Sequence, residues 1–380
     1  MTANIDPTSP ADYNLTSRKA HQQTIFFVCD GRNTGTHTFM YRIRLADIWL
    51  VYRLQHKGVR LDVRSAVLEP ASPLRLVLPA LLSPWHHRVV TIPLRRRDQG
   101  RRQSGFLQLR WRSSLPAMDV LYIAPSLEHA PGVTWFWKHL LQRGAEVAGA
   151  AGAQRLFAHV PAERHAEIEV LRQSGFALYA QDRLFRLDPP WPLAEQTTVP
   201  RHWTPQFDVD THGIQQLYRA ITPAVVQQAE SMGNNGDTAG GWWGETREGC
   251  YVVRPGPGEV LGYLRLTRGQ RGHWLKIVLH PELSDRADAL VQEALSLMRD
   301  WPKRPIFCDV REYEGYVGEG LQTHGFRPVM TRRLLVRHTT VPVRVAERQR
   351  LHVLNGSREH APTMSAKQMP PTYPFAKDKP

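Results

Sequence analysis

The pattern of apolar and polar residues predicts one order of elements that occurs twice along the chain. Short apolar runs bounded by turn residues are typical of buried strands, and apolar residues at helical spacing are typical of amphipathic helices. The first copy has strand, helix, strand, helix and strand at Asp119–Pro125, Gly132–Ala148, Arg155–Pro161, from about Glu163, and Arg183–Leu187. The second copy has the same order at His273–Pro281, Ser284–Asp300, Ile306–Val310, a short helix that ends at His324–Phe326, and Met330–Val336.

A Gly-Phe pair precedes the last strand of each copy. Phe176 and Phe326 lie 150 residues apart. A fixed offset between equivalent positions indicates an internal duplication. We therefore expect both phenylalanines to be buried, each in the core of its own copy.

The helix near Gly132–Ala148 has one strongly apolar face. Its apolar residues recur at i, i+3, i+4, i+7 and i+8, at Val133, Phe136, Trp137, Leu140 and Leu141. This spacing predicts a single buried face. We expect the aromatic residues of this face to lie in the core rather than to stack on a ligand.

The residues before the first copy predict further strands and a helix. Aromatic and β-branched runs at Thr24–Gly31 and Thr36–Leu45 predict two strands, and 89–114 predicts a hairpin with a polar turn. An amphipathic helix is expected to end at Gly58. The apolar residues expected on its buried face are Leu45, Ile48, Trp49, Tyr52 and Leu54.

A chain of 380 residues is long enough for two domains. The segment between the two copies contains prolines that fit neither a helix interior nor a central strand, at 189, 190, 192, 200 and 205. The sequence therefore predicts a disordered N-terminus, a first domain, a Pro-rich linker, a second domain and a disordered basic tail at 1–14, 15–188, 189–205, 206–338 and 339–380.

The formal net charge of +14 points to anionic partners such as nucleic acid, acidic protein or a phosphorylated cofactor. A basic solvated surface is the alternative interpretation. The hairpin is the most basic stretch, with eight Arg and one Asp between 88 and 112. Its aromatic residues, Phe106 and Trp111, are not interleaved among the arginines as a stacking platform requires, so nucleic-acid binding is not the favoured reading.

Three further features bound the function class. No apolar run is long enough to span a membrane, and the first residues lack a secretory pattern. The cysteines, Cys29, Cys250 and Cys308, are odd in number and scattered, which favours a reducing cytoplasm and no zinc site. The histidines near the first copy are not spaced as metal ligands, so no metal is expected.

The repeated order of elements resembles the GNAT family of acyl-CoA-dependent N-acyltransferases, in two tandem copies. The resemblance implies an α/β fold with a mixed sheet in each of two GNAT-like domains. GNAT enzymes bind acyl-CoA where two parallel strands splay apart. The pantetheine arm binds along the open edge of the first strand, and the pyrophosphate rests on the N-terminus of the next helix.

The resemblance assigns the cofactor, acetyl-CoA or another acyl-CoA, to the first copy. The implied contacts are the strand edge and the helix N-terminus, at Ile123, Ala124, Gly132, Val133 and Thr134. In the second copy the matching segment has no glycine and places Asp285 and Asp288 near the expected pyrophosphate. Like charge at that position disfavours cofactor binding.

The family's general acid is a tyrosine a few residues before the Gly-Phe pair. Leu171 and Leu321 occupy that position here. The remaining candidates are two tyrosines upstream of it and three groups near the first strand of each copy that are able to act as the base. They are Tyr313, Tyr316, Asp119, His273 and Glu259.

The resemblance therefore implies an N-acetyltransferase that acts on a small-molecule or protein amine. The alternative is a catalytically inactive GNAT-fold protein that serves as a binding or scaffold module, because a fold alone does not fix a function.

Overall fold

The computed structural model describes the ranges 26–28, 38–40, 43–78, 88–98, 101–112, 116–129, 132–191, 202–230, 249–256 and 258–339. The two predicted disordered ends lie outside these residues, except for Thr339. Two short strands, β1 (Phe26–Val28) and β2 (Thr38–Met40), pair antiparallel where strands were predicted.

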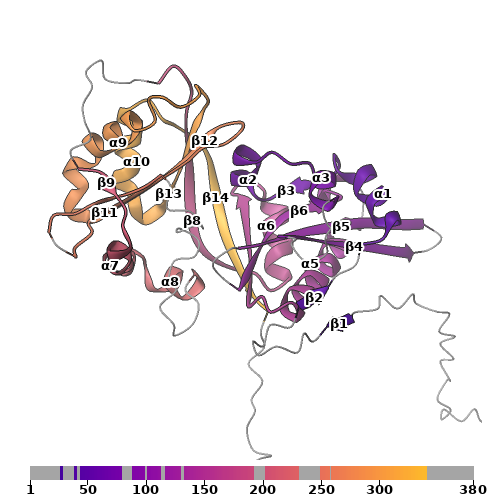
Figure 1. The fold of residues 1–380 in the computed structure, drawn as a ribbon. Coiled ribbons are helices and arrows are strands. Elements are labelled where there is room, and N and C mark those ends of the chain that lie inside the picture. Colours follow the sequence, from indigo (N-terminus) through magenta and orange to yellow (C-terminus); the bar gives the residue numbers. More distant parts are fainter. Residues whose placement is uncertain are drawn as a thin grey trace, which may run out of the picture. The chain divides into compact units, whose positions relative to one another are not determined.

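All other described strands form one mixed sheet of twelve strands (Figure 1). In sheet order they are β4 (Val89–Asp98), β5 (Arg101–Trp111), β6 (Ala117–Ala124), β7 (Arg155–Pro161), β14 (Arg327–His338), β8 (Ala177–Leu187), β13 (Ile306–Arg311), β12 (His273–Leu279), β11 (Gly262–Thr267), β10 (Cys250–Val253) and β9 (Thr204–Pro205). The short strand β3 (Val59–Arg60) pairs with β6 away from this path. Among the described strands, only two pairs are parallel, β6 with β7 and β12 with β13.

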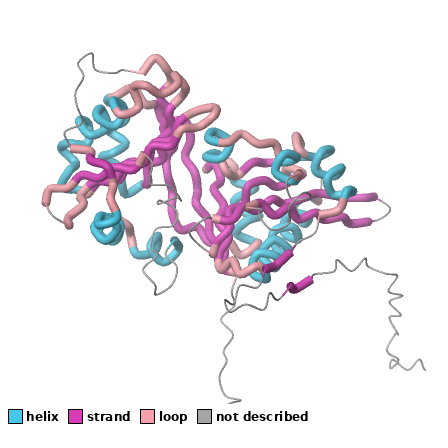
Figure 2. Tube along the Cα trace, viewed as in Figure 1, coloured by secondary structure: helices cyan, strands magenta, loops and turns pink. Residues whose placement is uncertain are grey.

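Helices flank the sheet in both copies (Figure 2). They are α1 (Leu45–Leu54), α2 (Val63–Leu68), α3 (Pro73–Val77), α5 (Val133–Ala150), α6 (His165–Gln173), α7 (Thr211–Ile221), α8 (Ala224–Glu230), α9 (Ala287–Ser296) and α10 (Gly315–Thr323). The predicted apolar face of α5 is buried in full. Phe176 and Phe326 are also buried, in two different core clusters, as the duplication predicts.

The last strand of each copy lies beside the parallel pair of the other copy. β14 from the second copy pairs with β7, and β8 from the first copy pairs with β13. β8 and β14 also pair with each other, and they run together between the two halves (Figure 1). The two copies thus exchange strands, and the exchange makes a single sheet.

The strand register repeats with the same offset as the sequence. Ile306 pairs with Leu187, and Leu156 pairs with Arg337, so each residue lies 150 positions from its counterpart in the other pair. Asp182 pairs with Arg332, its own counterpart, in the middle of the β8–β14 ladder. A pseudo-twofold axis that relates the two copies therefore passes between β8 and β14.

The predicted buried face of α1 is confirmed at Leu54, which is buried, and at Ile48, which is half-buried against the core, but it is wrong at the other three residues. Leu45, Trp49 and Tyr52 are 79%, 61% and 61% exposed, whereas the buried stripe is Asp47, Leu50, Val51 and Leu54. Both stripes have helical spacing, so periodicity alone does not choose between them. Asp47 settles the choice because its carboxylate accepts hydrogen bonds from the Arg44 backbone and from Arg95.

The two described ends of the predicted linker are packed onto the second copy. Trp191 and Trp203 are buried in the core cluster of that copy. Their indole N–H groups donate to the carbonyl oxygens of Arg304 and Leu290. The domain boundary within 189–205 stays a prediction.

Candidate functional site

The first parallel pair splays apart as the GNAT resemblance predicts. β6 and β7 pair only over Ala117–Asp119, although β6 continues to Ala124. Beyond the splay, the freed edge of β6 is taken by β3, with Val59 opposite Ile123. The Leu61 N–H also donates to the Leu121 carbonyl at 2.9 Å. Because β5 occupies the other edge of β6, β3 lies on the edge that a pantetheine arm would use.

The segment that leads into β3 is fixed by close contacts to β6. The Tyr122 hydroxyl accepts from the Gly58 N–H at 2.9 Å and donates to the Gln55 carbonyl at 2.6 Å. A Cβ at Gly58 would lie 2.5 Å from the Ile123 carbonyl oxygen, so only glycine fits here. The first opening is therefore filled by the chain itself.

The predicted cofactor residues of the first copy lie in two places. Ile123 and Ala124 are both buried in β6. Ile123 pairs with β3 and with β5, whereas Ala124 pairs with β5. Gly132, at φ +82°, precedes α5, in which Val133 is buried and Thr134 is exposed. The pairing of Ile123 on both edges argues against a cofactor role for this residue, and the roles of Ala124 and of the α5 N-terminus stay predictions.

The second parallel pair also splays, after Leu275. Here side chains fill the opening. The Tyr316 hydroxyl donates to the Leu279 carbonyl at 2.5 Å, on the edge of β12. The Lys276 ammonium donates to the buried Glu314 carboxylate at 3.2 Å and to the Asp309 carbonyl at 3.1 Å.

The two helices that follow the second splay are in close contact. A Cβ at Gly320 of α10 would lie 3.2 Å from the backbone of Ala287 at the start of α9. His324 lies 3.0 Å from an Asp288 carboxylate oxygen at the same end of α9. This end of α9 thus contacts α10 and carries Asp288. That the second copy binds no pyrophosphate stays a prediction.

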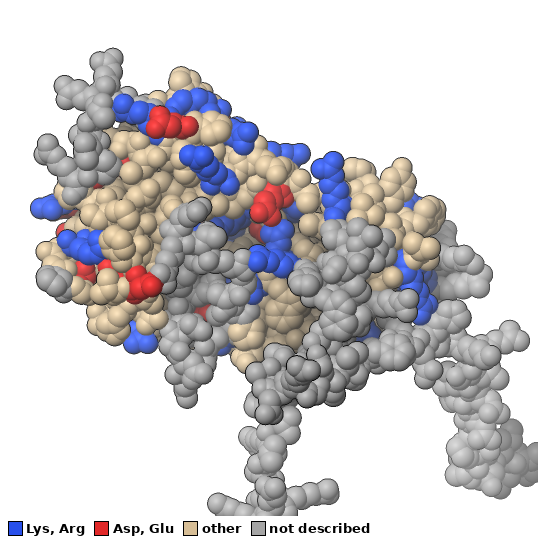
Figure 3. Space-filling view, in the orientation of Figure 1, with Lys and Arg blue, Asp and Glu red and all other residues tan. Residues whose placement is uncertain are grey.

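A cavity of about 550 Å³ lies on one face of the sheet, between the two copies. Its walls come from both splayed pairs, from the exchanged strands β8 and β14, and from α2. It is lined by eight Arg and Lys residues and six Asp and Glu residues. Basic side chains surround a hollow near the middle of this face in the space-filling view (Figure 3). We call this cavity the central pocket.

Five ion pairs lie among the described residues that line the central pocket. Two of them are long, Arg110 with Asp62 at 3.7 Å and Lys276 with Asp309 at 3.6 Å, and the other three are short. The Arg112 guanidinium binds Asp119 with its nearest oxygen at 2.6 Å. Arg332 binds Asp182 through two bonds, of 2.8 and 2.5 Å. The third pair joins Arg311 at the end of β13 to Glu230 at the end of α8, at 2.6 Å.

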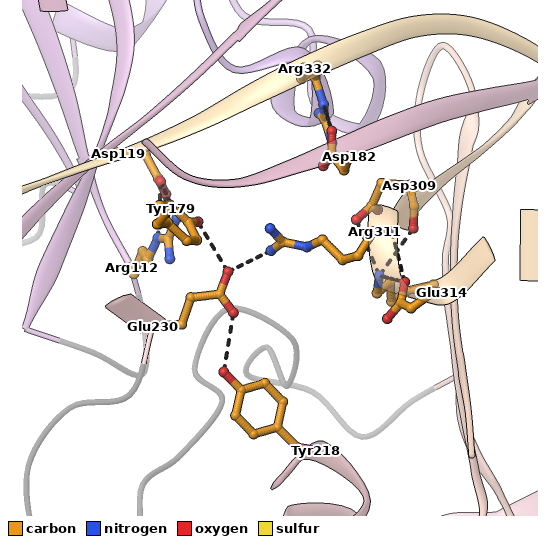
Figure 4. A network of polar contacts seen from close by, with 11 residues as sticks. Arg112, Asp119, Tyr179, Asp182, Tyr218, Glu230, Asp309, Arg311, Glu314 and Arg332 are labelled. Atoms are coloured by element: carbon orange, nitrogen blue, oxygen red, sulfur yellow. Dashed lines mark hydrogen bonds and ion pairs between the residues drawn. The ribbon is translucent and has the colours of Figure 1, made fainter. Parts of the chain in front are cut away.

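Glu230 makes further hydrogen bonds besides its ion pair with Arg311 (Figure 4). Besides Arg311, it accepts from the hydroxyls of Tyr179 and Tyr218, at 3.1 and 3.4 Å. Burial and then the Glu230 charge raise the pKa of both tyrosines well above the usual value. Burial alone would lower the pKa of Arg311, but Glu230 together with other nearby acidic groups outweighs it, so the pKa is raised and Arg311 stays a cation.

Asp309 and His159 occupy equivalent positions, 150 residues apart, and both line the central pocket. Burial works to raise the Asp309 pKa, but Lys276 and other cations outweigh it and hold the pKa well below the usual range. Burial, followed by the charge of Arg332, lowers the pKa of His159. The ring is thus neutral at pH 7, and its Nε2 is buried with no partner among the described residues.

The predicted catalytic candidates do not gather in one place. Asp119 lines the central pocket, where Arg112 binds it. His273 is buried between Trp191 and Trp301, and its Nε2 lies 2.8 Å from the Pro302 carbonyl. His273 does not line the central pocket, and neither do Glu259, Tyr313 and Tyr316.

Those other candidates are distributed along the second copy. Glu259 is exposed in the turn before β11. Tyr316 bonds to the edge of β12. The Tyr313 hydroxyl is buried and has no partner among the described residues, and burial raises its pKa to about 12.

Sequence reasoning missed the residues that define the pocket. Glu230 comes from a helix 81 positions before its partner Arg311, and no local pattern joins them. The Asp182–Arg332 pair does carry a signal, because the two residues lie at the repeat offset of 150 with opposite charge.

Neither a metal centre nor a membrane segment appears in the described part of the chain. No group of three or more His, Cys, Asp or Glu side chains there is placed to hold a metal ion. No helix among the described residues is long and apolar enough to cross a membrane. Cys250 and Cys308 are both buried, and neither forms a disulfide with a described residue; Cys29 lies outside the described residues.

Comparisons with known proteins give matches only to solved structures. No protein-family model and no curated protein matches this sequence. The crystal structure of a GCN5-related N-acetyltransferase from Sphaerobacter thermophilus matches at 12% identity and a TM-score of 0.44, over 76% of this chain and 98% of that one. A tandem GNAT protein from the clavulanic acid biosynthesis pathway matches at 17% identity and a TM-score of 0.40, over 67% and 84%.

The strand order of this chain agrees with the predicted fold. Each copy has a parallel pair that splays, with a helix between its strands and a helix after it that leads into the last strand. The sheet is mixed, as predicted. The chain therefore has the fold of two GNAT units in tandem, joined into one sheet by the exchange of their last strands.

Proposed function

We propose that the protein is a GNAT-fold binding protein that takes a small molecule into the central pocket and does not bind acyl-CoA at either splayed pair. One observation supports the claim that acyl-CoA does not bind at the first splayed pair. The edge of β6 that a pantetheine arm needs is already paired with β3.

The energy of displacing β3 supports the proposal. Val59 and Leu61 are 4% and 1% exposed. Exposing two such side chains costs roughly 3–6 kcal/mol, before any loss of strand pairing. That cost would weaken cofactor binding by roughly 10²- to 10⁴-fold.

The second copy offers no better binding site for acyl-CoA. A pantetheine arm along β12 would compete with the Tyr316 hydroxyl for the Leu279 carbonyl. The end of α9 that contacts α10 carries Asp288, which repels a pyrophosphate. The central pocket, by contrast, has a volume within the range of small-molecule sites, roughly 300–1,000 Å³.

Native mass spectrometry tests this function. The purified protein is expected to retain or take up a molecule much smaller than coenzyme A, and to show no added mass after incubation with acetyl-CoA. A stoichiometric acetyl-CoA adduct that survives desalting would overturn the proposal.

Acyl transfer from acetyl-CoA to a small-molecule or protein amine is the second candidate, and one observation favours it. The central pocket reaches both splayed pairs, and the neutral His159 lines it together with Asp119. A neutral imidazole is able to take a proton from an amine nucleophile. Thiol release from acetyl-CoA in the presence of a panel of amines, lost in His159→Gln, would establish this activity in place of the first.

A further inference from the structure

Arg311 has hydrogen-bond donors that the described residues leave unused. Its side chain is 9% exposed, and one terminal nitrogen donates to Glu230. Its Nε and Nη1 atoms are buried and have no acceptor among the described residues. A guanidinium carries five N–H donors, and burying them without acceptors is unfavourable. The site therefore lacks an acceptor for Arg311.

The position of Arg311 is fixed by the strand that carries it. It is the last residue of β13, and its backbone N–H donates to Glu314 at 2.9 Å. Glu230 holds the other end of the side chain. An arginine that is held at both ends loses little freedom when it binds an anion, which favours binding.

A second cation faces the same cavity. Arg64 on α2 lines the central pocket, with its guanidinium 5.8 Å from the centre of the Trp274 ring. In the described part of the chain, no carboxylate lies within ion-pair distance of Arg64. Arg311 lines the same cavity from the end of β13, so the two arginines face the central pocket from different elements.

The lining of the central pocket as a whole carries a net positive charge. Eight Arg and Lys residues against six Asp and Glu residues leave an excess of two positive charges in the lining. Inside a cavity with low-dielectric walls, such an excess attracts anions more strongly than it would at an open surface.

We propose that the central pocket binds the oxyanion group, a carboxylate or a phosphate, of a small ligand between Arg311 and Arg64. Arg311 supplies the buried donors, and Arg64 supplies the second charge from α2. His159 lines the same cavity and offers its Nε2 to a polar group elsewhere on the ligand. This inference rests on the proposed function, since it names the chemical class of the molecule that the pocket takes.

Calorimetric titration tests the inference with three probes: citrate, inorganic phosphate and 1,5-diaminopentane. Binding of citrate but not phosphate would identify a carboxylate site, and the reverse would identify a phosphate site. We expect at least one of these anions to bind the wild type. If neither anion binds at about 10 mM, the inference fails. If only the diamine binds, this inference fails while the proposed function stands.

Two variants and one control locate the anion. Arg64→Gln is expected to weaken binding by about tenfold, as the loss of a charged hydrogen-bond donor does. Arg311→Gln combined with Glu230→Gln removes the pair together, so no buried charge is left alone, and should weaken binding at least as much. The control, Arg268→Gln, removes an exposed arginine that packs on Trp301 outside the pocket.

Thermal melting first establishes that each variant is folded. If the folded double variant binds the anion as tightly as the wild type, Arg311 is not the anchor and the inference is overturned. An equal loss in Arg268→Gln would also overturn it, because general surface charge would then explain the binding.

Discussion

Asp182 and Arg332 lie at the centre of the pseudo-twofold relation, and each belongs to a different copy. Both are 3% exposed, and the guanidinium binds the carboxylate through two hydrogen bonds. A one-residue slip of β14 against β8 would separate the two charges and turn each to the other face. The pair therefore fixes the register at which the two copies join.

The first prediction concerns this pair. Asp182→Ala is expected to lower the free energy of unfolding by about 3–5 kcal/mol, because it leaves the Arg332 charge buried alone. Replacing both residues with leucine should recover most of that loss. Urea denaturation measures both variants, and a single variant as stable as wild type would show that the pair does not hold the register.

The second prediction concerns His159 and pH. Burial lowers its pKa in the folded state, so the unfolded chain binds the proton more readily. The stability from this group is present above the usual pKa of about 6.5 and is lost as the pH falls through the lower folded value. His159→Gln should therefore lose less stability than wild type between pH 7.5 and 5.5. Equal losses in denaturant titrations at the two pH values would contradict this assignment.

At the scale of elements, the proposed function depends on the short strand β3. Two residues, Val59 and Arg60, close the edge of β6 that the GNAT resemblance assigns to the cofactor. The strand depends on Gly58, where a side chain would meet both the Ile123 carbonyl and the Tyr122 ring at 2.5 Å.

The third prediction follows from that contact. Gly58→Val should displace the start of β3 and lower the free energy of unfolding by about 1–3 kcal/mol, as overpacking does. Gly256→Ala is the matched control, because a Cβ there meets nothing within 4 Å. Chemical denaturation compares the two, and equal stability of the Gly58 variant and the control would show that β3 is not held as described.

The sequence predicted elements well where one local pattern decides. The face of α5 follows from the spacing of its own apolar residues, and Phe176 and Phe326 follow from the repeat. Three of the five residues predicted on the buried face of α1 are exposed, because two stripes have the same spacing and a distant arginine, Arg95, selects one of them. β3 is too short to give any periodic signal.

The site was less predictable than the fold, because it forms from residues distant in sequence. Asp119 was named from its position at the first splay, and it does line the central pocket. Arg311 and Glu230 both belong to the second copy, but they lie 81 positions apart on different elements. Glu230 also accepts a hydrogen bond from Tyr179 of β8 in the first copy. No alternation of apolar residues specifies either contact.

At the scale of the whole molecule, the exchange makes the two copies depend on each other. β14 lies between β7 and β8, so the first copy alone would leave both of these strands with an open edge. The same holds for β13 and β14 if the second copy is alone. Open edges in central strands favour misfolding and aggregation.

The fourth prediction is that neither half folds alone. A fragment of residues 15–201 and one of residues 202–339 should each lack cooperative thermal unfolding by circular dichroism, and mixing them during refolding should restore it. Cooperative unfolding of either isolated fragment would show that the copies are independent domains.

The fifth prediction tests the central claim, that the chain itself closes the acyl-CoA sites of both copies. Calorimetric titration of the wild type with acetyl-CoA is the most direct measurement, with Gly132→Asp as the companion variant because it adds a negative charge at the α5 N-terminus. The account predicts no saturable heat at millimolar acetyl-CoA for either protein. One-to-one binding by the wild type that is abolished in Gly132→Asp would contradict the account and place the cofactor at the first copy.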